Sequence, residues 1–256
     1  MSRVALYVPG SRPDRFDRAA ATGAEVILDL EDAVAAAEKE AARSAVVAWL
    51  GPSEVKTQVR VNAPHTAELE ADLAALPPGV PLRVPKVESP EDLAAFAGRT
   101  VHVLLESALG IENAFDVARV AGVASLALGE ADLAAELGLD GEDAFTWVRS
   151  RVVVAARAAG LPAPMMAAYP DVADVGGLAD SCARGRALGM RGRTAIHPAQ
   201  VPVIRAAFAP TDAEVAWARE VLAALGDRGV TTLDDGSMVD AAMRRRASQI
   251  LEDAEA

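Results

Sequence analysis

Two stretches of the sequence place acidic residues directly after a short apolar run. Glu106 follows the run 101–105, and Glu130 and Asp132 follow the run 125–128. Each run has the length of a buried strand, and each is followed by a helix-forming segment. A strand that delivers a carboxylate at its C-terminal end, twice in succession, predicts a metal or acid/base site at the rim of a parallel sheet.

Further charged residues follow other strand-like runs. Glu31, Arg60 and Lys86 each lie at or just beyond the end of such a run. Four carboxylates would then lie at one rim, those of Glu31, Glu106, Glu130 and Asp132. They would repel each other unless a cation lay between them. Oxygen ligands, without a Cys cluster or a His pair in the sequence, favour Mg²⁺ or Mn²⁺ over Zn²⁺. We therefore expect a hard divalent cation at this rim.

The predicted metal site combines Glu106 and Asp132, which come from adjacent strands. Two carboxylates suit a Mg²⁺ ion that keeps room for water and substrate oxygens. Arg60 could bind a substrate carboxylate or carbonyl in fork geometry. Such a site would hold an α-oxo or α-hydroxy acid and stabilise an enolate beside it. Other interpretations stay open: either acid could cap a helix, Arg60 could pair with Glu31, and Lys86 could bridge the acids or contact the substrate.

The elements that must position this rim alternate regularly along the chain. We expect a helix at 89–98, and eight strand-type runs at 4–8, 25–30, 56–61, 82–87, 101–105, 125–128, 165–169 and 193–196. This alternation favours a parallel sheet with right-handed crossovers. Eight units within about 200 residues favour a closed (β/α)₈ TIM barrel over an open sheet. Pro85 predicts a bulge or a strand end, because proline lacks a backbone donor.

The chain is expected to divide into a barrel and a short extension. Residues 1–210 would form the barrel that carries the active site, and residues 211–256 a C-terminal helical extension. Within the extension we expect helices at 212–225 and 239–255, separated by a polar loop at 231–237. This extension is a candidate to pack on a neighbouring subunit.

Composition excludes several classes of partner. The 256 residues are 52% hydrophobic and carry a net charge of −12, which argues against nucleic acid or an anionic membrane as the main partner. No apolar run approaches the length of about 18 residues that a membrane-spanning helix needs. The single Cys182 excludes an internal disulfide. We therefore expect a cytoplasmic protein.

Eight motifs in the chain resemble a known family. In order they read LYVPGSRPDRF, VILDLEDAVAAAEKEAAR, VRVN, PKVES, LLESALGIENA, LGEADLAAELG, GRTAIHPAQV and SMVDAAMRRRA. Together they resemble the citrate lyase β-subunit-like group of the HpcH/HpaI aldolase superfamily, whose members include malyl-CoA, citramalyl-CoA and citryl-CoA lyases. The resemblance implies a Mg²⁺-dependent barrel that cleaves or forms a 3-hydroxyacyl thioester, with a 2-oxo acid such as oxaloacetate and an acyl thioester as the products of cleavage.

The resemblance also implies roles for individual residues. By matching position, Glu106 and Asp132 would be the metal ligands, with Glu106 also beside the substrate. Arg60 would bind the oxo-acid part. Glu31 would be a catalytic carboxylate that holds metal-bound water or orients Arg60. Arg12 would contact the phosphates of CoA.

The last implied role involves a neighbouring subunit. Asp240 matches an acidic residue that serves in acid/base work from a C-terminal segment covering a neighbour's site. Since the family generally forms trimers or hexamers, we expect a homo-oligomer. Three alternatives stay open: a thioester carried on an acyl carrier protein, a pyruvate-type class II aldolase that acts without CoA, and a citrate lyase complex subunit that is inactive alone.

Overall fold

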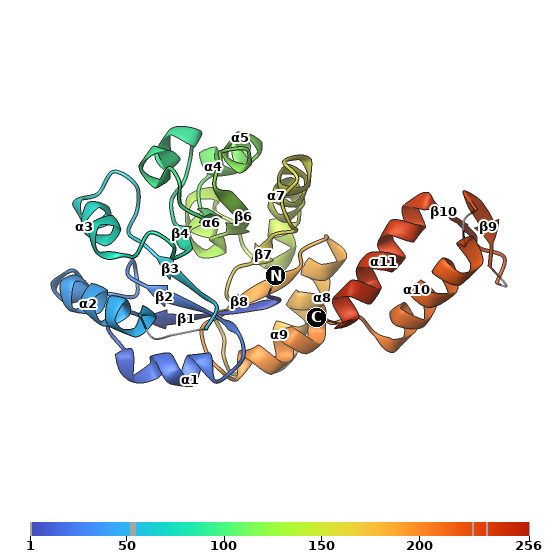
Figure 1. The fold of residues 1–256 in the computed structure, drawn as a ribbon, viewed down its shortest axis with the longest axis horizontal. Coiled ribbons are helices and arrows are strands. Elements are labelled where there is room, and N and C mark those ends of the chain that lie inside the picture. The colour runs from blue at the N-terminus through green and yellow to red at the C-terminus, as the bar shows by residue number, and fades with distance from the viewer. Residues whose placement is uncertain (1, 52–54, 227, 234, 256) are drawn as a thin grey trace. The chain divides into compact units, whose positions relative to one another are not determined.

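The chain forms two compact units, which Figure 1 colours from blue at the N-terminus to red at the C-terminus. The computed structural model describes residues 2–51, 55–226, 228–233 and 235–255. The first unit is Met1–Ala207, and the second is Phe208–Ala256.

The first unit is a closed barrel of parallel strands with helices around it (Figure 1). Strands that follow each other in the sequence pair side by side, and the first pairs with the eighth to close the barrel. They are β1 (Val4–Pro9), β2 (Glu25–Asp29), β3 (Thr57–Arg60), β4 (Leu82–Val84), β5 (Val101–Leu105), β6 (Val123–Leu128), β7 (Met165–Met166) and β8 (Gly192–Ala195). This order confirms the predicted (β/α)₈ TIM barrel.

Helical segments connect successive strands of the barrel, and α9 follows the last strand. They are η1 (Pro13–Arg15), α1 (Phe16–Ala20), η2 (Ala36–Glu38), α2 (Lys39–Leu50), α3 (Ala67–Ala75), η3 (Pro90–Phe96), α4 (Ala108–Glu112), α5 (Ala114–Ala118), α6 (Glu130–Leu137), η4 (Glu142–Phe145), α7 (Thr146–Ala158), α8 (Val175–Ala187) and α9 (Gln200–Phe208), where η marks a 3₁₀ helix. No helix among the described residues is long and apolar enough to cross a bilayer.

Two barrel elements differ from the expectation. The segment expected as a helix at 89–98 is the 3₁₀ helix η3, which opens with an i→i+3 bond of 3.2 Å from the Asp92 amide to the Ser89 carbonyl. β7 is much shorter than the predicted run 165–169. The carbonyl of Ala167 accepts a hydrogen bond of 2.8 Å from the Arg193 side chain, which takes the place of a strand partner.

Strand ends set where the polar residues begin. β4 ends at Val84, directly before Pro85, which confirms that this proline marks a strand end. All five residues of β2 are buried, because helices cover the outer face and side chains fill the inside. Aliphatic side chains such as Ile27 fill part of the barrel interior beside a buried polar layer that includes Arg83, and further charged residues gather where the strands stop.

The second unit contains two helices and a β-hairpin. These elements are α10 (Asp212–Leu225), β9 (Val230–Thr232), β10 (Met238–Asp240) and α11 (Ala241–Glu255). The predicted polar loop 231–237 was wrong at its start, because β9 and β10 pair in antiparallel fashion there. The β-branched residues 230–232 favour a strand even though they are partly polar. Position 234 of that predicted loop lies outside the described residues.

Candidate active site

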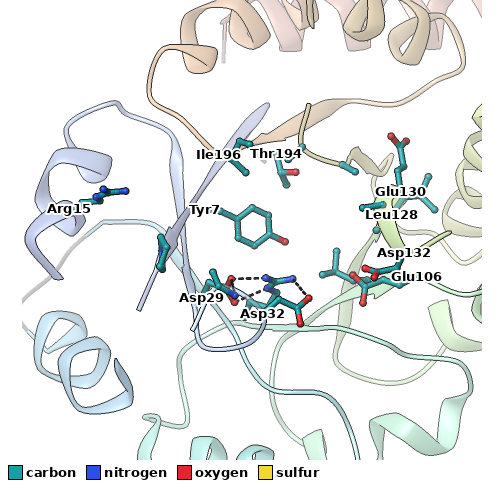
Figure 2. A pocket seen from close by; sticks show the side chains of 18 residues that line it. Tyr7, Arg15, Asp29, Asp32, Glu106, Leu128, Glu130, Asp132, Thr194 and Ile196 are labelled. Atoms are coloured by element: carbon teal, nitrogen blue, oxygen red, sulfur yellow. Dashed lines mark hydrogen bonds and ion pairs between the residues drawn. The ribbon is translucent and has the colours of Figure 1, made fainter. Parts of the chain in front are cut away.

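A cavity of about 410 Å³ opens at the C-terminal ends of the barrel strands. Its walls come from several strand ends, so residues far apart in the sequence meet there (Figure 2). The polar residues that line it include Tyr7, Asp29, Arg60, Glu106, Asp132 and Thr194. The predicted rim site therefore coincides with a cavity large enough for a small organic acid.

One side of the cavity is built around Arg60. Its Nε and Nη2 donate to the two carboxylate oxygens of Asp29 at 2.8 and 2.6 Å, and its Nη1 lies 2.9 Å from Oε2 of Glu31. Burial opposes the charge of Arg60, but the hydrogen bonds to Asp29 and the negative charges of Asp29 and Glu31 together raise the pKa of Arg60 above its usual value. The guanidinium is thus fixed as a permanent cation at the edge of the cavity.

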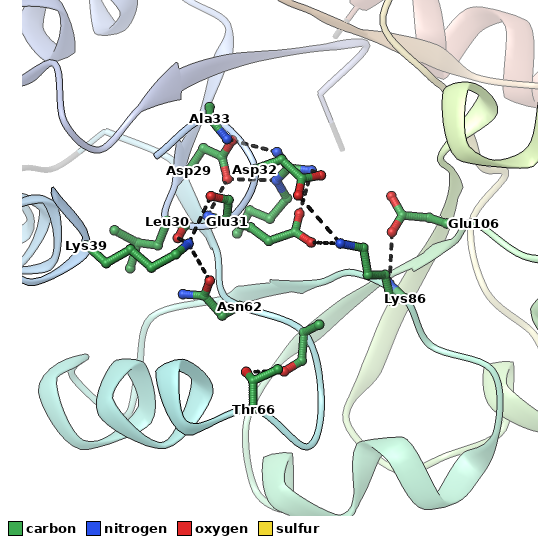
Figure 3. Close-up of polar contacts among 12 residues, drawn as sticks. Asp29, Leu30, Glu31, Asp32, Ala33, Lys39, Asn62, Thr66, Lys86 and Glu106 are labelled. Carbon is green, nitrogen blue, oxygen red and sulfur yellow. Dashed lines mark hydrogen bonds and ion pairs between the residues drawn. The ribbon is translucent and has the colours of Figure 1, made fainter. Parts of the chain in front are cut away.

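Lys86 joins this side to the next strand end (Figure 3). Its Nζ lies 2.7 Å from Oε1 of Glu31 and 3.5 Å from Oδ1 of Asp32. Its backbone has a φ of 54°, which is rare for a residue with a side chain. This conformation points the backbone N–H of Lys86 at Oε2 of Glu106, at 2.9 Å. The strained backbone therefore serves the site, since it positions both ends of the residue.

Lys39 supports the same side from behind, which the sequence did not reveal. Its Nζ donates to the carbonyls of Leu30 and Glu31 at 2.8 and 3.0 Å, and to Oδ1 of Asn62 at 2.6 Å (Figure 3). An ammonium group has three donors, so all of them are used. Lys39 thereby holds the turn that presents Glu31 and Asp32 after β2.

The opposite side of the cavity carries two carboxylates without a cation. Glu106 is buried and Asp132 is exposed to the cavity, and neither forms an ion pair with a residue that the structure describes. Burial, reinforced by the charge of Glu31 nearby, raises the pKa of Glu106 to about 7. The hydrogen bond from Lys86 opposes this rise but does not cancel it.

Gly129 gives Glu106 the space that it occupies. A Cβ atom at this position would lie 2.4 Å from both Cγ and Oε1 of Glu106. Any other residue would therefore displace the carboxylate. Gly129 lies just before α6, the helix that carries Asp132, so this close approach also brings the two acids toward one region of the cavity.

This pair of acids fits a hard divalent cation. Among the described residues there is no group of three or more His, Cys, Asp or Glu side chains that could hold a metal. Mg²⁺ needs only one or two protein carboxylates, because water and substrate oxygens complete its octahedral shell. The pKa of Glu106 is raised first by burial and then by the charges of Glu31 and Asp132, and a bound cation would oppose all of these effects. Glu106 and Asp132 could therefore hold Mg²⁺, as the sequence predicted.

Four of the predicted site residues are not among those that line this cavity: Glu31 and Lys86 line a neighbouring hollow, and Arg12 and Asp240 line neither. Arg12 pairs with the carboxylate of Asp14 at 2.9 and 2.8 Å and is not among the residues that line the cavity, whereas Arg15 is. Asp240 belongs to the second unit, where its Oδ1 accepts hydrogen bonds from the Ala242 and Met243 amides at the start of α11. Its acid/base role and the CoA contact of Arg12 stay predictions.

Comparisons with known proteins find relatives of one family. The model of the family described as HpcH/HpaI aldolase/citrate lyase matches residues 3–198. A citrate lyase subunit beta-like protein of Mycobacterium tuberculosis is 39% identical, over 96% of this chain and 93% of its own length. The L-malyl-CoA/beta-methylmalyl-CoA lyase of Rhodobacter capsulatus is 31% identical, over 100% of this chain and 95% of its own.

Solved structures that resemble the chain include two of proteins of this type. The CitE protein of Mycobacterium tuberculosis in complex with magnesium, acetoacetate and coenzyme A matches with a TM-score of 0.89 and 36% identity, covering 100% of this chain and 98% of that one. The citrate lyase beta subunit of the same organism, complexed with oxaloacetate and magnesium, matches with a TM-score of 0.75 and 36% identity, over 82% of this chain and 97% of that one.

Proposed function

The chain belongs to the HpcH/HpaI aldolase/citrate lyase family of lyases, and from this premise we propose that it is a Mg²⁺-dependent carbon–carbon lyase. Its substrate would be a 3-hydroxyacyl thioester of the malyl-CoA, citramalyl-CoA or citryl-CoA type. Cleavage would give a 2-oxo acid and an acyl thioester. One observation carries the proposal: a fixed Arg60 guanidinium and an unpaired carboxylate couple, Glu106 with Asp132, line the same cavity.

Different residues of the chain would bind different parts of the substrate. Glu106 and Asp132 would hold Mg²⁺, which when bound supplies Lewis-acid polarisation of the substrate oxygens. Arg60 has five N–H donors, of which three are directed at Asp29 and Glu31. Its remaining donors would bind the carboxylate of the hydroxy acid. Because Asp29 fixes the guanidinium beforehand, little ordering would be needed on binding.

Glu31 is the proposed catalytic carboxylate. Burial raises the pKa of Glu31, although Arg60 and Lys86 oppose the rise, and a carboxylate with a raised pKa is a stronger base than usual. A base would take the hydroxyl proton of the substrate, the oxygen electron pair would form the new carbonyl, and the pair of the broken C–C bond would leave as the thioester enolate. Protonation of that enolate completes a redox-neutral cleavage. A water held by Glu31, or Asp240 of a neighbouring subunit, would act as the base.

The thioester carrier and the assembly are also proposals. The positions of Arg12 and Arg15 near the start of α1 would suit the phosphates of CoA, with Arg15 the residue that lines the cavity. An acyl carrier protein presents the same thioester, so it remains the alternative carrier. We propose a homotrimer or hexamer in which the second unit packs on a neighbour, and a cytoplasmic location in keeping with the single, buried Cys182.

The test is isothermal titration with Mg²⁺ and with oxaloacetate, pyruvate or glyoxylate, each with and without acetyl-CoA. We expect Mg²⁺-dependent binding of an oxo acid to wild type and its loss in Asp132→Ala. Asp140→Ala is the matched control, because this exposed acid does not line the cavity and should bind as wild type does.

Each outcome separates the candidate functions. An additional signal with acetyl-CoA selects a CoA-ester lyase over a pyruvate-type class II aldolase. If wild type binds neither metal nor oxo acid, the lyase site is refuted for the isolated chain, and a complex subunit that is inactive alone becomes the better explanation.

A further inference from the structure

The Tyr7 hydroxyl reaches into the middle of the cavity without a partner. Tyr7 belongs to β1 and lines the cavity together with Arg60, Glu106 and Asp132 (Figure 2). The hydroxyl forms no hydrogen bond with any residue that the structure describes. Because Tyr7 is half-buried and its hydroxyl lines the cavity, that hydroxyl is available to hydrogen-bond a ligand bound there.

The ring of Tyr7 is held firmly, so the position of its hydroxyl is set. Ala5, Ile27 and Met165 pack with it inside the barrel. The guanidinium of Arg60 lies 5.1 Å from the ring centroid, within the range of a cation–π contact. The hydroxyl hydrogen is then the main freedom left to the side chain.

A buried polar layer supports the ring from within the barrel. The guanidinium of Arg83 lies 5.9 Å from the centroid of the Tyr7 ring and is 1% exposed. Its Nε donates to Gln58 at 3.0 Å, and Gln58 donates in turn to Glu25 at 2.9 Å. This chain of contacts places the charge of Arg83 beside the ring and joins it to strands β2 and β3. An aliphatic interior would have left the phenol ring without that fixed neighbour.

We propose that Tyr7 donates a hydrogen bond from its hydroxyl to an oxygen of the bound oxo acid, and so helps to determine which acid the site accepts. The inference rests on the proposed lyase function. Burial raises the pKa of Tyr7, although Arg83 and Arg60 oppose the rise, so the group is a protonated donor at neutral pH. A fixed donor strengthens the binding of an acid with an oxygen at that point and weakens the binding of an acid with a methyl group there.

The test is Tyr7→Phe, which removes one oxygen and keeps the ring, its packing and its contact with Arg60. In isothermal titration at saturating Mg²⁺, we expect the affinity for the preferred oxo acid to fall about tenfold. The differences in affinity among oxaloacetate, pyruvate and glyoxylate should also become smaller. Affinity for Mg²⁺ alone should not change, since a phenol is not among the proposed ligands.

The control is the same substitution at the other tyrosine. Tyr169 donates its hydroxyl to Asp174 at 2.7 Å and does not line the cavity, so Tyr169→Phe should bind oxo acids as wild type does. Unchanged affinity and unchanged preference in Tyr7→Phe would overturn the role of Tyr7 and leave the lyase proposal standing. If wild type binds no oxo acid at all, both proposals fall together.

Discussion

The two sides of the cavity solve the problem of buried charge in opposite ways. On the side of β2 and β3, Asp29 and Glu31 surround Arg60, so each buried charge has a counter-charge in contact. On the side of β5 and β6, Glu106 and Asp132 lie without an ion-pair partner among the described residues. The first side is therefore complete in the free protein, whereas the second becomes complete only when a cation arrives.

The two sides of the cavity should respond differently to substitution. A buried charge that loses its partner destabilises the fold by several kcal/mol, because the remaining charge has neither water nor a counter-ion. A buried carboxylate without a partner already carries that cost in the free protein. Substitutions on the paired side should therefore change stability first, and substitutions on the unpaired side should change metal binding first.

The largest expected effect is that of Asp29→Ala on stability. Asp29 contacts Arg60 through both carboxylate oxygens and also accepts the backbone N–H groups of Glu31 and Ala33 at 2.9 and 3.3 Å. We expect the free energy of unfolding to fall by about 3–5 kcal/mol, because Arg60 is left buried and only partly compensated. Urea denaturation of the metal-free protein measures this change.

An exposed ion pair provides the control for Asp29. Asp14 pairs with Arg12 at 2.8 Å, but both side chains are largely in solvent, so Asp14→Ala should leave the free energy of unfolding nearly unchanged. A loss for Asp29→Ala no larger than that for Asp14→Ala would mean that the paired side is not pre-organised, and the comparison between the two sides would fail.

The next effect is that of Glu106→Gln, and it should have the opposite sign. The pKa of Glu106 is raised to about 7 from a usual value of 4.5, so the folded protein binds an extra proton between these two pH values. Stability due to this group is therefore greatest below pH 4.5 and is lost as pH rises through 7. In chelator at pH 8, Glu106→Gln should be more stable than wild type by roughly 1–3 kcal/mol.

Metal binding reverses that ranking. Mg²⁺ should stabilise wild type at pH 8 by mass action and leave Glu106→Gln nearly unchanged, because an amide is a poor replacement for the carboxylate. Thermal unfolding of wild type and variant, with and without Mg²⁺ at pH 5 and at pH 8, measures the stability of each protein under four conditions. If the stability of wild type and variant depends on pH in the same way, the pKa of Glu106 is not raised in the folded protein.

The sequence predicted the barrel because its signals are local. Apolar runs of strand length alternate with helical segments, and polar residues follow the runs, so both the fold and the rim could be inferred. The family resemblance was confirmed by a family model that covers residues 3–198 and by relatives of at least 31% identity. The hairpin of β9 was missed, because Thr231 and Thr232 look like loop residues when only polarity is considered.

The parts of the site that escaped prediction depend on contacts across the barrel. Lys39 acts through backbone carbonyls eight and nine residues before it, and no side-chain pattern marks such a bond. Tyr7 lies within the predicted strand 4–8 without a polar neighbour in the sequence to mark it, and only the closed barrel brings it to the same cavity as Glu106 and Asp132. Which arginine near α1 reaches the cavity also depends on the turn of a short helix: Arg15 lines the cavity, whereas the CoA contact of Arg12 stays a prediction.

Gly129→Ala tests the unpaired side by displacement alone and should have the smallest effect. The added Cβ would lie 2.4 Å from Oε1 of Glu106, so the carboxylate must move while its charge and that of Asp132 remain. We expect Mg²⁺ affinity to fall about tenfold, since ligand geometry is strict for this ion. Gly79→Ala is the matched control, because a Cβ there meets no atom within 4 Å. If both variants bind Mg²⁺ as wild type does, the position of Glu106 is not what the ion requires, and the unpaired side owes its affinity to charge alone.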